Sequence, residues 1–172
     1  MTEEFPMKMT VLYYSVTGNT KKMAEVIAQG MMSVEGVAAK AFSIDEIDEA
    51  WIRESKCVVL GTPTYTASMC AAVKDWLDKL RGRDYGVPGK IAGAFATADY
   101  VHGGGDIAIQ GILDHLLVRG MLAYSGGGAL GKPGIHLGPV ALTHNLDEYS
   151  EIFQLYGKRM ASKTVEIFRP GA

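Results

Sequence analysis

The stretch MTVLYYSVTGNT, residues 9–20, decides the fold of this chain. Its first half, 9–14, is a mostly apolar run, which is typical of a strand buried on both faces of a sheet. Its second half, 15–20, is almost entirely small or polar, and apolar side chains at helical spacing continue from 20 to 32. A buried strand, a polar turn and an amphipathic helix in this order predict an α/β fold.

The same alternation continues along the rest of the sequence. Further strands are predicted at 37–44, 57–61, 91–96 and 121–124, further helices at 68–80, 106–118 and 146–168, and a weak helix or turn at 48–55. Strands that alternate with helices indicate a parallel sheet covered on both faces, a three-layer α/β/α sandwich. Five strands in this rhythm favour the doubly wound order 2-1-3-4-5. We expect a single domain over residues 1–172.

Composition narrows the classes of function. Apolar residues make up 48% of the sequence, charged residues 21%, and the formal net charge is −2. This balance argues against a nucleic-acid-binding protein and against a strongly acidic electron carrier. The N-terminus lacks the pattern of a signal peptide, and no stretch approaches the ~20 apolar residues of a membrane span. We therefore expect a cytoplasmic protein without membrane insertion.

The two cysteines, Cys57 and Cys70, are interpreted as buried thiols in a reducing compartment. Twelve residues separate them, so they lack the CxxC spacing that lowers a thiol pKa in redox pairs. No spacing of histidines, cysteines or carboxylates matches a metal site, and no metal is predicted.

The turn after the first strand has the character of an anion site. Hydroxyl, amide and glycine residues meet there at the start of a helix, where unpaired N–H groups and the helix dipole attract a phosphate. The simpler interpretation is that these side chains only cap the helix. The candidate phosphate-binding residues are Ser15, Thr17, Gly18, Asn19 and Thr20.

Several other chemistries are excluded by the same turn. It lacks the GxxxxGK[ST] pattern of a P-loop and the GxGxxG pattern of a dinucleotide site. It contains no cysteine for a phosphate-transferring thiolate. The predicted strands 1 and 3 end in Tyr14-Ser15 and Gly61-Thr62, without the acidic cluster of a receiver domain.

Two more loops follow strands that end at the same edge of the predicted sheet. After the third strand, Pro63 stiffens the turn and Tyr65 offers a ring face to a flat heterocycle, unless it is an ordinary surface tyrosine. After the fourth strand, three glycines at 103–105 allow the backbone to approach a ligand closely, unless they form only a flexible turn. Parallel sheets bind ligands in this crevice, near the switch point between strands 1 and 3.

Together the three loops resemble those of the flavodoxin-like family, and within it those of the WrbA-type NAD(P)H:quinone oxidoreductases. The resemblance runs from about Lys8 to Phe168. Its motifs are the TGNT-like loop, the G-x-P-T-Y run at 61–65, and a GG segment at 103–104 followed by an L-L-x-x-G-M run at 116–121. The resemblance implies the flavodoxin-like fold and FMN as the cofactor.

The resemblance also implies a role for each loop. The residues of the first loop cradle the FMN phosphate. The isoalloxazine ring and the ribityl chain are bordered by Pro63, Thr64, Tyr65, Thr97, Ala98, Gly103 and Gly104.

Two departures from the family pattern bear on the reaction. Arg119 stands where WrbA-type members usually have a histidine near the flavin or substrate, so Arg119 either meets an anionic substrate or points away. Residues 63–68 contain no glycine, and a peptide flip that needs positive φ is costly there. Since that flip stabilises one-electron-reduced flavin in electron carriers, we interpret its absence as favouring two-electron chemistry.

The leading hypothesis is therefore an FMN-dependent oxidoreductase that takes electrons from NADH or NADPH and passes them to quinones or similar acceptors. The flavin carries the chemistry, with no essential acid or base, and His102 and Arg119 are candidate substrate contacts. The alternatives are a flavodoxin that carries single electrons between proteins, and a flavin-binding regulatory protein without turnover. The resemblance further implies a homodimer or homotetramer.

Overall fold

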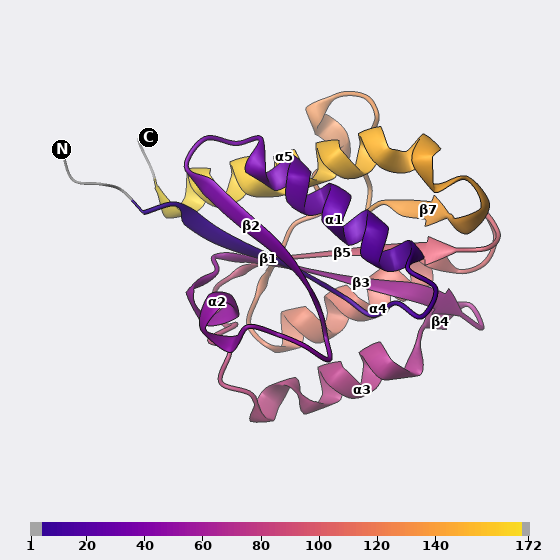
Figure 1. Cartoon of the computed structure of the whole chain (residues 1–172), viewed down its shortest axis with the longest axis horizontal. Helices are drawn as coiled ribbons and strands as arrows, with labels where there is room; N and C mark the ends of the chain where they lie inside the picture. The colour runs from indigo at the N-terminus through magenta and orange to yellow at the C-terminus, as the bar shows by residue number, and fades with distance from the viewer. Residues whose placement is uncertain (1–4, 170–172) are drawn as a thin grey trace.

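The structure, a computed structural model, describes residues 5–169. Its central strand, β1 (Met7–Tyr13), pairs in parallel with β2 (Val37–Ser43) on one side and β3 (Cys57–Tyr65) on the other. β3 in turn pairs in parallel with β5 (Ile91–Ala98). The carboxyl ends of these parallel strands lie together at one edge of the sheet, on the right of Figure 1.

Helices cover both faces of this sheet (Figure 1). Along β1 and β3 successive side chains point to opposite faces, so Val11 and Val59 pack with Phe153 while Leu12 and Leu60 pack with Trp76. The first core lies under α1 (Asn19–Met32) and α5 (Ser150–Phe168). The second lies under α2 (Glu49–Glu54), α3 (Ala71–Lys79) and α4 (Gly105–Val118). The predicted three-layer α/β/α sandwich is confirmed.

Glycines allow α1 and α5 to approach closely. A Cβ at Gly30 would lie 2.1 Å from the carbonyl oxygen of Gln154, and one at Gly157 would lie 2.1 Å from that of Ile27. Any side chain at either position would separate the helices. This contact keeps α1, which begins at the candidate phosphate loop, at a set distance from the last helix.

The fifth strand differs from the prediction. Instead of one strand at 121–124, two short segments share the fifth position: β6 (Leu122–Ala123) pairs with the start of β5 and β7 (Val140–Leu142) with its end. The expected order 2-1-3-4-5 is otherwise present as β2-β1-β3-β5-β6. A glycine-rich loop leaves the sheet between the two segments, and Arg159 of α5 holds it by hydrogen bonds to its carbonyl groups.

The helix expected from residue 68 is also shifted. β3 continues to Tyr65, and β4 (Ser68–Met69) folds back on it as an antiparallel hairpin before α3 begins at Ala71. A 3-10 segment, Thr143–Tyr149, likewise precedes α5, so the last helix begins at Ser150 rather than 146.

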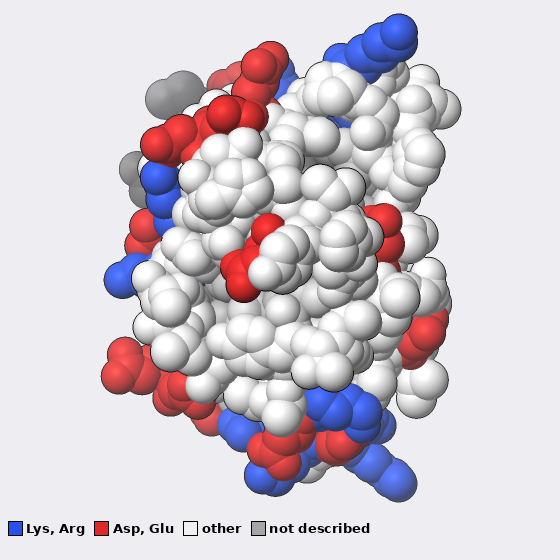
Figure 2. Space-filling model, turned by 90° about the vertical axis from the view of Figure 1, so that its right-hand side faces the viewer, with Lys and Arg blue, Asp and Glu red and all other residues white. Residues whose placement is uncertain are grey.

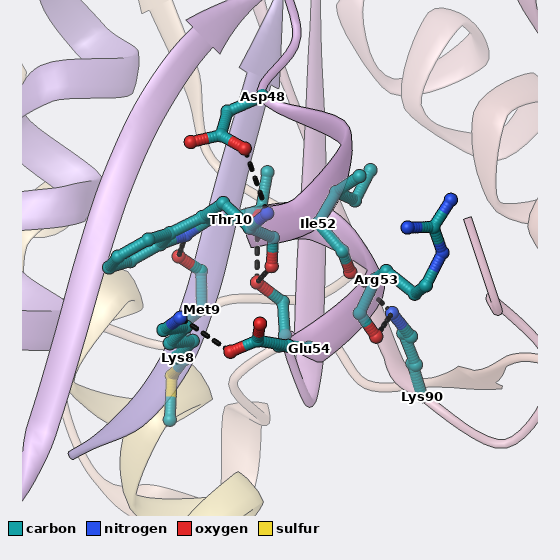
Figure 3. Close-up of polar contacts among 10 residues, drawn as sticks. Lys8, Met9, Thr10, Asp48, Ile52, Arg53, Glu54 and Lys90 are labelled. Carbon is teal, nitrogen blue, oxygen red and sulfur yellow. Dashed lines mark hydrogen bonds and ion pairs between the residues drawn. The ribbon is translucent and has the colours of Figure 1, made fainter. Parts of the chain in front are cut away.

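A polar cluster around α2 lies at the amino-terminal end of the sheet, away from the strand carboxyl ends (Figure 3). Lys90 is buried there, and its ammonium donates to the carbonyls of Ile52, Arg53 and Tyr85. Burial, and then the neighbouring cations Lys56 and Arg53, lower the pKa of Lys90 to about 8. The cluster caps the end of α2 and is structural.

His115 and the two cysteines lie outside the site and have structural roles. The Nδ1 atom of His115 lies 2.6 Å from the carbonyl oxygen of Gly111 within α4. Cys57 and Cys70 are buried free thiols, and burial raises the pKa of Cys57 to about 12. Across residues 5–169, no helix is long and apolar enough to cross a membrane, and no three histidine, cysteine or acidic side chains gather as metal ligands would.

Candidate functional site

Two adjoining cavities lie at the carboxyl ends of β1, β3 and β5. The first, of about 170 Å³, is enclosed by the turn before α1, the end of β3 and the end of β5. The second, of about 530 Å³, lies between the β3–β4 hairpin and the loop after β5. The two share Thr64, Tyr65, Ala98 and Asp99 as lining residues.

Most of the predicted cofactor residues lie in these cavities. The first cavity is lined by Ser15, Thr17, Asn19, Thr20, Pro63, Thr64, Tyr65, Thr97 and Ala98. Gly103 lines the second. The two remaining residues, Gly18 and Gly104, are the N-cap residues of α1 and α4. The structure thus brings together residues from three loops that are distant in the sequence.

The N-terminus of α1 is open toward a ligand. Gly18 has a φ of +90°, and among the described residues no side chain caps this helix. The Gly18 N–H donates to Ser15 Oγ at 3.1 Å, and the first helical hydrogen bond runs from Lys22 N to Gly18 O. The N–H groups before Lys22 therefore have no partner within the helix. The interpretation of this turn as a mere helix cap does not fit the structure.

No lysine contributes its charge to this turn. Lys22 forms an ion pair with Asp147 at 2.6 Å, and Lys21 lies 4.0 Å from Glu25. An anion bound in this turn would therefore be held by N–H groups, hydroxyls and the helix dipole.

The hairpin that lines both cavities is strained. Thr66 has a φ of +50° and Ala67 a φ of +58°, and these two residues form the tip between the paired residues Tyr65 and Ser68. A two-residue hairpin tip with both φ values positive matches the right-handed twist of the strands. We expected a peptide flip that needs positive φ to be costly in this glycine-free loop. Thr66 and Ala67 already hold positive φ in the paired hairpin, so that cost is present without any flip. Two-electron chemistry stays a prediction.

The glycine loop packs directly on this hairpin. Gly104 has a φ of +92°, and a Cβ there would lie 2.6 Å from the Cα of Ala67. A Cβ at Gly103 would lie 2.9 Å from the carbonyl oxygen of Tyr100. Gly104 is therefore needed both for its backbone conformation and for the close contact between the two loops, whereas Gly103 allows the tight turn within its own loop.

One buried hydroxyl in the wall of the cavities lacks a partner. Thr64 Oγ1 is inaccessible to solvent and forms no hydrogen bond to any residue in the range 5–169. Buried polar atoms are nearly always paired, so an orphaned hydroxyl at a cavity wall fits a site completed by a bound polar ligand.

Two polar residues that line the first cavity were not selected from the sequence. Thr143, which follows β7, donates its hydroxyl hydrogen bond to Asp99 Oδ1 at 2.6 Å, and both line the first cavity. Thr143 has no local signal, because it reaches the site only through the split fifth strand. Asp99 does lie in a loop that we selected, directly after Ala98, and its position at the strand end was the available signal.

Of the two candidate substrate contacts, His102 lies near the cavities and Arg119 does not. His102 stacks on Tyr100 with ring centroids 5.7 Å apart, and both side chains are exposed beside the second cavity. Arg119 is the C-cap of α4, whose 14 residues extend over about 21 Å from the end at Gly104. Arg119 is therefore not part of this site, because the helix carries it to the other edge of the sheet.

The face around the cavities carries little charge. Figure 2, which views the side where the strands end, has a broad central area without lysine or arginine and with an acidic group near its middle. Within the described part of the chain, Asp99 is the one carboxylate that lines the two cavities. Tyr65 and Val16 are 50% and 68% exposed on this face.

Comparison with known proteins agrees with this geometry. Residues 11–107 match the model of the flavodoxin family. The chain is 39% identical to a flavodoxin of Clostridium saccharobutylicum over 162 residues, which cover 94% of this chain and all of that protein.

The chain belongs to the flavodoxin family.

Less similar relatives include proteins named as enzymes. The chain is 28% identical to an NAD(P)H dehydrogenase (quinone) of Aromatoleum aromaticum over 142 residues, 67% of this chain and 69% of that protein. The narrower resemblance to WrbA-type oxidoreductases thus rests on weaker matches than the membership of the flavodoxin family.

Two solved structures share the fold. A flavodoxin, WrbA-like protein from Agrobacterium tumefaciens superposes with a TM-score of 0.76 at 21% identity, covering 93% of this chain and 98% of that one. A Fusobacterium nucleatum flavodoxin mutant bound to flavin mononucleotide superposes with a TM-score of 0.67 at 20% identity, covering 92% and 97%. At these identities the likeness concerns the fold alone.

Proposed function

We propose that this protein is an FMN-binding electron carrier of the flavodoxin type. The observation that carries the proposal is the open N-terminus of α1 beside a hydroxyl-lined cavity at the switch point of the sheet. Its membership of the flavodoxin family supports the same function. From the sequence this function was an alternative hypothesis, and we now prefer it to an NAD(P)H-dependent oxidoreductase.

The residues present fit FMN. The phosphate would be held by the N–H groups of the first turn of α1 and by the hydroxyls of Ser15, Thr17 and Thr20. The ring would lie along Pro63, Thr64 and Tyr65, where a polar group of the flavin would pair with the Thr64 hydroxyl. The backbone at Thr97, Ala98, Gly103 and Gly104 would border the rest of the cofactor. Bound FMN supplies the redox chemistry.

The residues of the chain would bind the cofactor, orient it and shield it. Tyr65 and the strained hairpin tip form one wall, and the glycine loop that packs on it forms the other. Because Tyr65 and Val16 of the site are exposed on this face, a redox partner that docks against it would lie close to the bound flavin. No side chain here is required to move a proton.

The second candidate is an NAD(P)H-dependent oxidoreductase that reduces quinones. Its support is the set of relatives with that name at about 28% identity and the adjoining cavity of about 530 Å³. Against it, no lysine or arginine among residues 5–169 lines either cavity to bind the phosphates of a nicotinamide nucleotide. A homodimer or homotetramer stays a prediction.

One experiment separates these functions. The protein is loaded with FMN, freed of excess flavin, and mixed without oxygen with NADH or NADPH while the visible absorbance of the flavin is followed. For a carrier, both nucleotides leave the flavin oxidised, dithionite reduces it, and added cytochrome c then takes its electrons. Rapid reduction by either nucleotide, reversed by a quinone, would instead establish the oxidoreductase. Failure to retain FMN would overturn both.

A further inference from the structure

Another cavity, of about 300 Å³, lies beside α3. In the described part of the chain it shares no lining residue with the two cofactor cavities. One wall consists of Ile44 and Asp45, which follow β2, and Arg83 lines the cavity beyond the end of α3. The α3 residues that line it are Ala72, Asp75, Trp76 and Lys79. A cavity of this size accommodates one small molecule.

Trp76 carries a buried hydrogen-bond donor without a partner. The residue is 5% exposed, and its Nε1 atom forms no hydrogen bond to any residue in the range 5–169. Stacking on Tyr85, with ring centroids 6.3 Å apart, holds the indole ring in place. Buried polar atoms are nearly always paired, and an unpaired one costs free energy. An orphaned donor on a residue that lines a cavity therefore indicates a ligand with an acceptor atom.

Two charged residues of the cavity also lack a partner of opposite charge. Arg83 forms no ion pair with any described residue, and its Nη1 atom donates to Tyr85 Oη at 3.0 Å, which orients the guanidinium. The carboxylate of Asp45 forms no hydrogen bond or ion pair within residues 5–169. Lys79 and Asp75, by contrast, neutralise each other at 2.7 Å. The cavity thus offers one unpaired cation, one unpaired anion and one unpaired N–H group.

We propose that this cavity binds a small zwitterion of the α-amino acid class. The ligand carboxylate accepts hydrogen bonds from the guanidinium of Arg83, whose planar fork matches it, and from Trp76 Nε1. The ligand ammonium donates to the carboxylate of Asp45. Ile44, Ala72 and the indole ring contact an apolar side chain of the ligand. One molecule thereby satisfies all three groups that the chain leaves unpaired.

The test follows the indole N–H resonance of Trp76 by proton–nitrogen correlation NMR of the purified full-length chain. The chain has two tryptophans, so the resonance is assigned by its loss in W76F or its retention in W51F. The probe is L-leucine. Two fragments of it serve as matched probes: isocaproate lacks the ammonium group, and isopentylamine lacks the carboxylate. The fragments test the same contacts without any substitution in the protein.

We expect L-leucine to shift the resonance saturably and each fragment to bind about tenfold more weakly or worse, because a charged hydrogen bond is lost. R83M and D45N should weaken the binding of leucine by a similar factor, and D45N should leave the binding of isocaproate unchanged. The matched controls are R81M and E46Q. Arg81 and Glu46 are exposed neighbours that do not line the cavity, so each control should change the dissociation constant less than about twofold.

Three results would overturn the proposal. The Trp76 resonance shows no saturable shift with L-leucine, or a control variant weakens binding as much as R83M and D45N do, or isocaproate binds as tightly as leucine. The last result would assign the cavity to simple carboxylates. None of these results depends on the proposed function, because the cavity shares no described lining residue with the cofactor cavities.

Discussion

The hydroxyl groups of Thr20 and Thr97 lie 2.8 Å apart in a buried hydrogen bond, although 77 residues separate them in the sequence. Thr20 belongs to the first turn of α1 and Thr97 to the end of β5, and both line the first cavity. The bond therefore joins the candidate phosphate loop to the strand that borders the rest of the site. It sets the distance between two walls of the cavity before any ligand binds.

Replacement of Thr20 by valine should destabilise the protein without FMN by about 1–3 kcal/mol, because it leaves the buried Thr97 hydroxyl without a partner. The measurement is urea unfolding followed by circular dichroism. T17V is the matched control, since Thr17 is exposed and should tolerate valine within about 0.5 kcal/mol. Equal stabilities of T20V and wild type would contradict the structural role of the bond.

The phosphate site can be tested by comparing FMN with riboflavin, which lacks the phosphate. The double variant T17A/T20A should bind FMN at least tenfold more weakly, because each lost hydroxyl removes a donor worth about 1 kcal/mol. Its affinity for riboflavin should change much less.

The control for this experiment is K21A/K22A. These lysines face Glu25 and Asp147, so their loss should leave the preference for FMN over riboflavin nearly intact. If the lysine variant loses that preference and the threonine variant keeps it, the phosphate is held elsewhere.

Ala67→Gly should stabilise the fold by up to about 1 kcal/mol, because Ala67 has a φ of +58° and glycine adopts positive φ without steric cost. Thermal unfolding of the apo protein measures the effect. Ala72→Gly, within α3, is the matched substitution in ordinary helical backbone and should destabilise by about 1 kcal/mol. A loss of stability in both variants would show that the hairpin tip is unstrained.

Lys90 should make stability depend on pH in the alkaline range. Its pKa is lowered from 10.5 to about 8, so between these values the unfolded chain binds more protons than the folded one. By linkage, its contribution to the free energy of unfolding rises with pH across this window, by at most about 1.4 kcal/mol per pH unit. Below pH 8 the cost of burying the charged ammonium is fully present.

The measurement is the difference in unfolding free energy between wild type and K90M from pH 7.5 to 10. K90M also leaves three carbonyl groups without their donor, but that loss is an offset that does not vary with pH. We expect the difference to shift in favour of the wild type as pH rises. A flat or falling difference would contradict the lowered pKa.

Arg159 should control the order of the loop inserted into the fifth strand. Its buried guanidinium donates to five carbonyl groups, those of Gly126, Gly127, Leu130, Gly131 and Pro133. R159M removes all five bonds and should cost about 2–4 kcal/mol. Hydrogen exchange should speed up in the loop first, while K158M, one position earlier in α5, leaves the exchange unchanged.

Much of the fold follows from local pattern. The strand at 9–14 and the helix from 20 to 32 are recognisable because apolar runs and helical periodicity are properties of neighbouring residues. The polar turn between them lies at the carboxyl end of the strand in any parallel sheet. The predicted site residues in the three loops therefore come together as the topology of such a sheet requires.

Other features have no local signal. Val140–Leu142 is too short to be recognised as a strand and becomes one only because the edge of β5 offers it hydrogen bonds. Thr66 and Ala67 adopt positive φ against their own preference because the pairing of Tyr65 with Ser68 requires it. Arg119 lies outside the site because it follows the last residue of the 14-residue helix α4, at the end far from the cavities.

The sequence by itself determined the class of fold, the edge of the sheet where the two cavities lie and most residues of the three loops around them, since these depend on periodicity and on where strands end. Only the tertiary structure decided which charge enters the site and what holds it. The bond between Asp99 and Thr143 joins segments 44 residues apart through a strand pairing that neither segment specifies alone. Contacts of this kind depend on the free energy of the whole sheet, which no short stretch of sequence encodes.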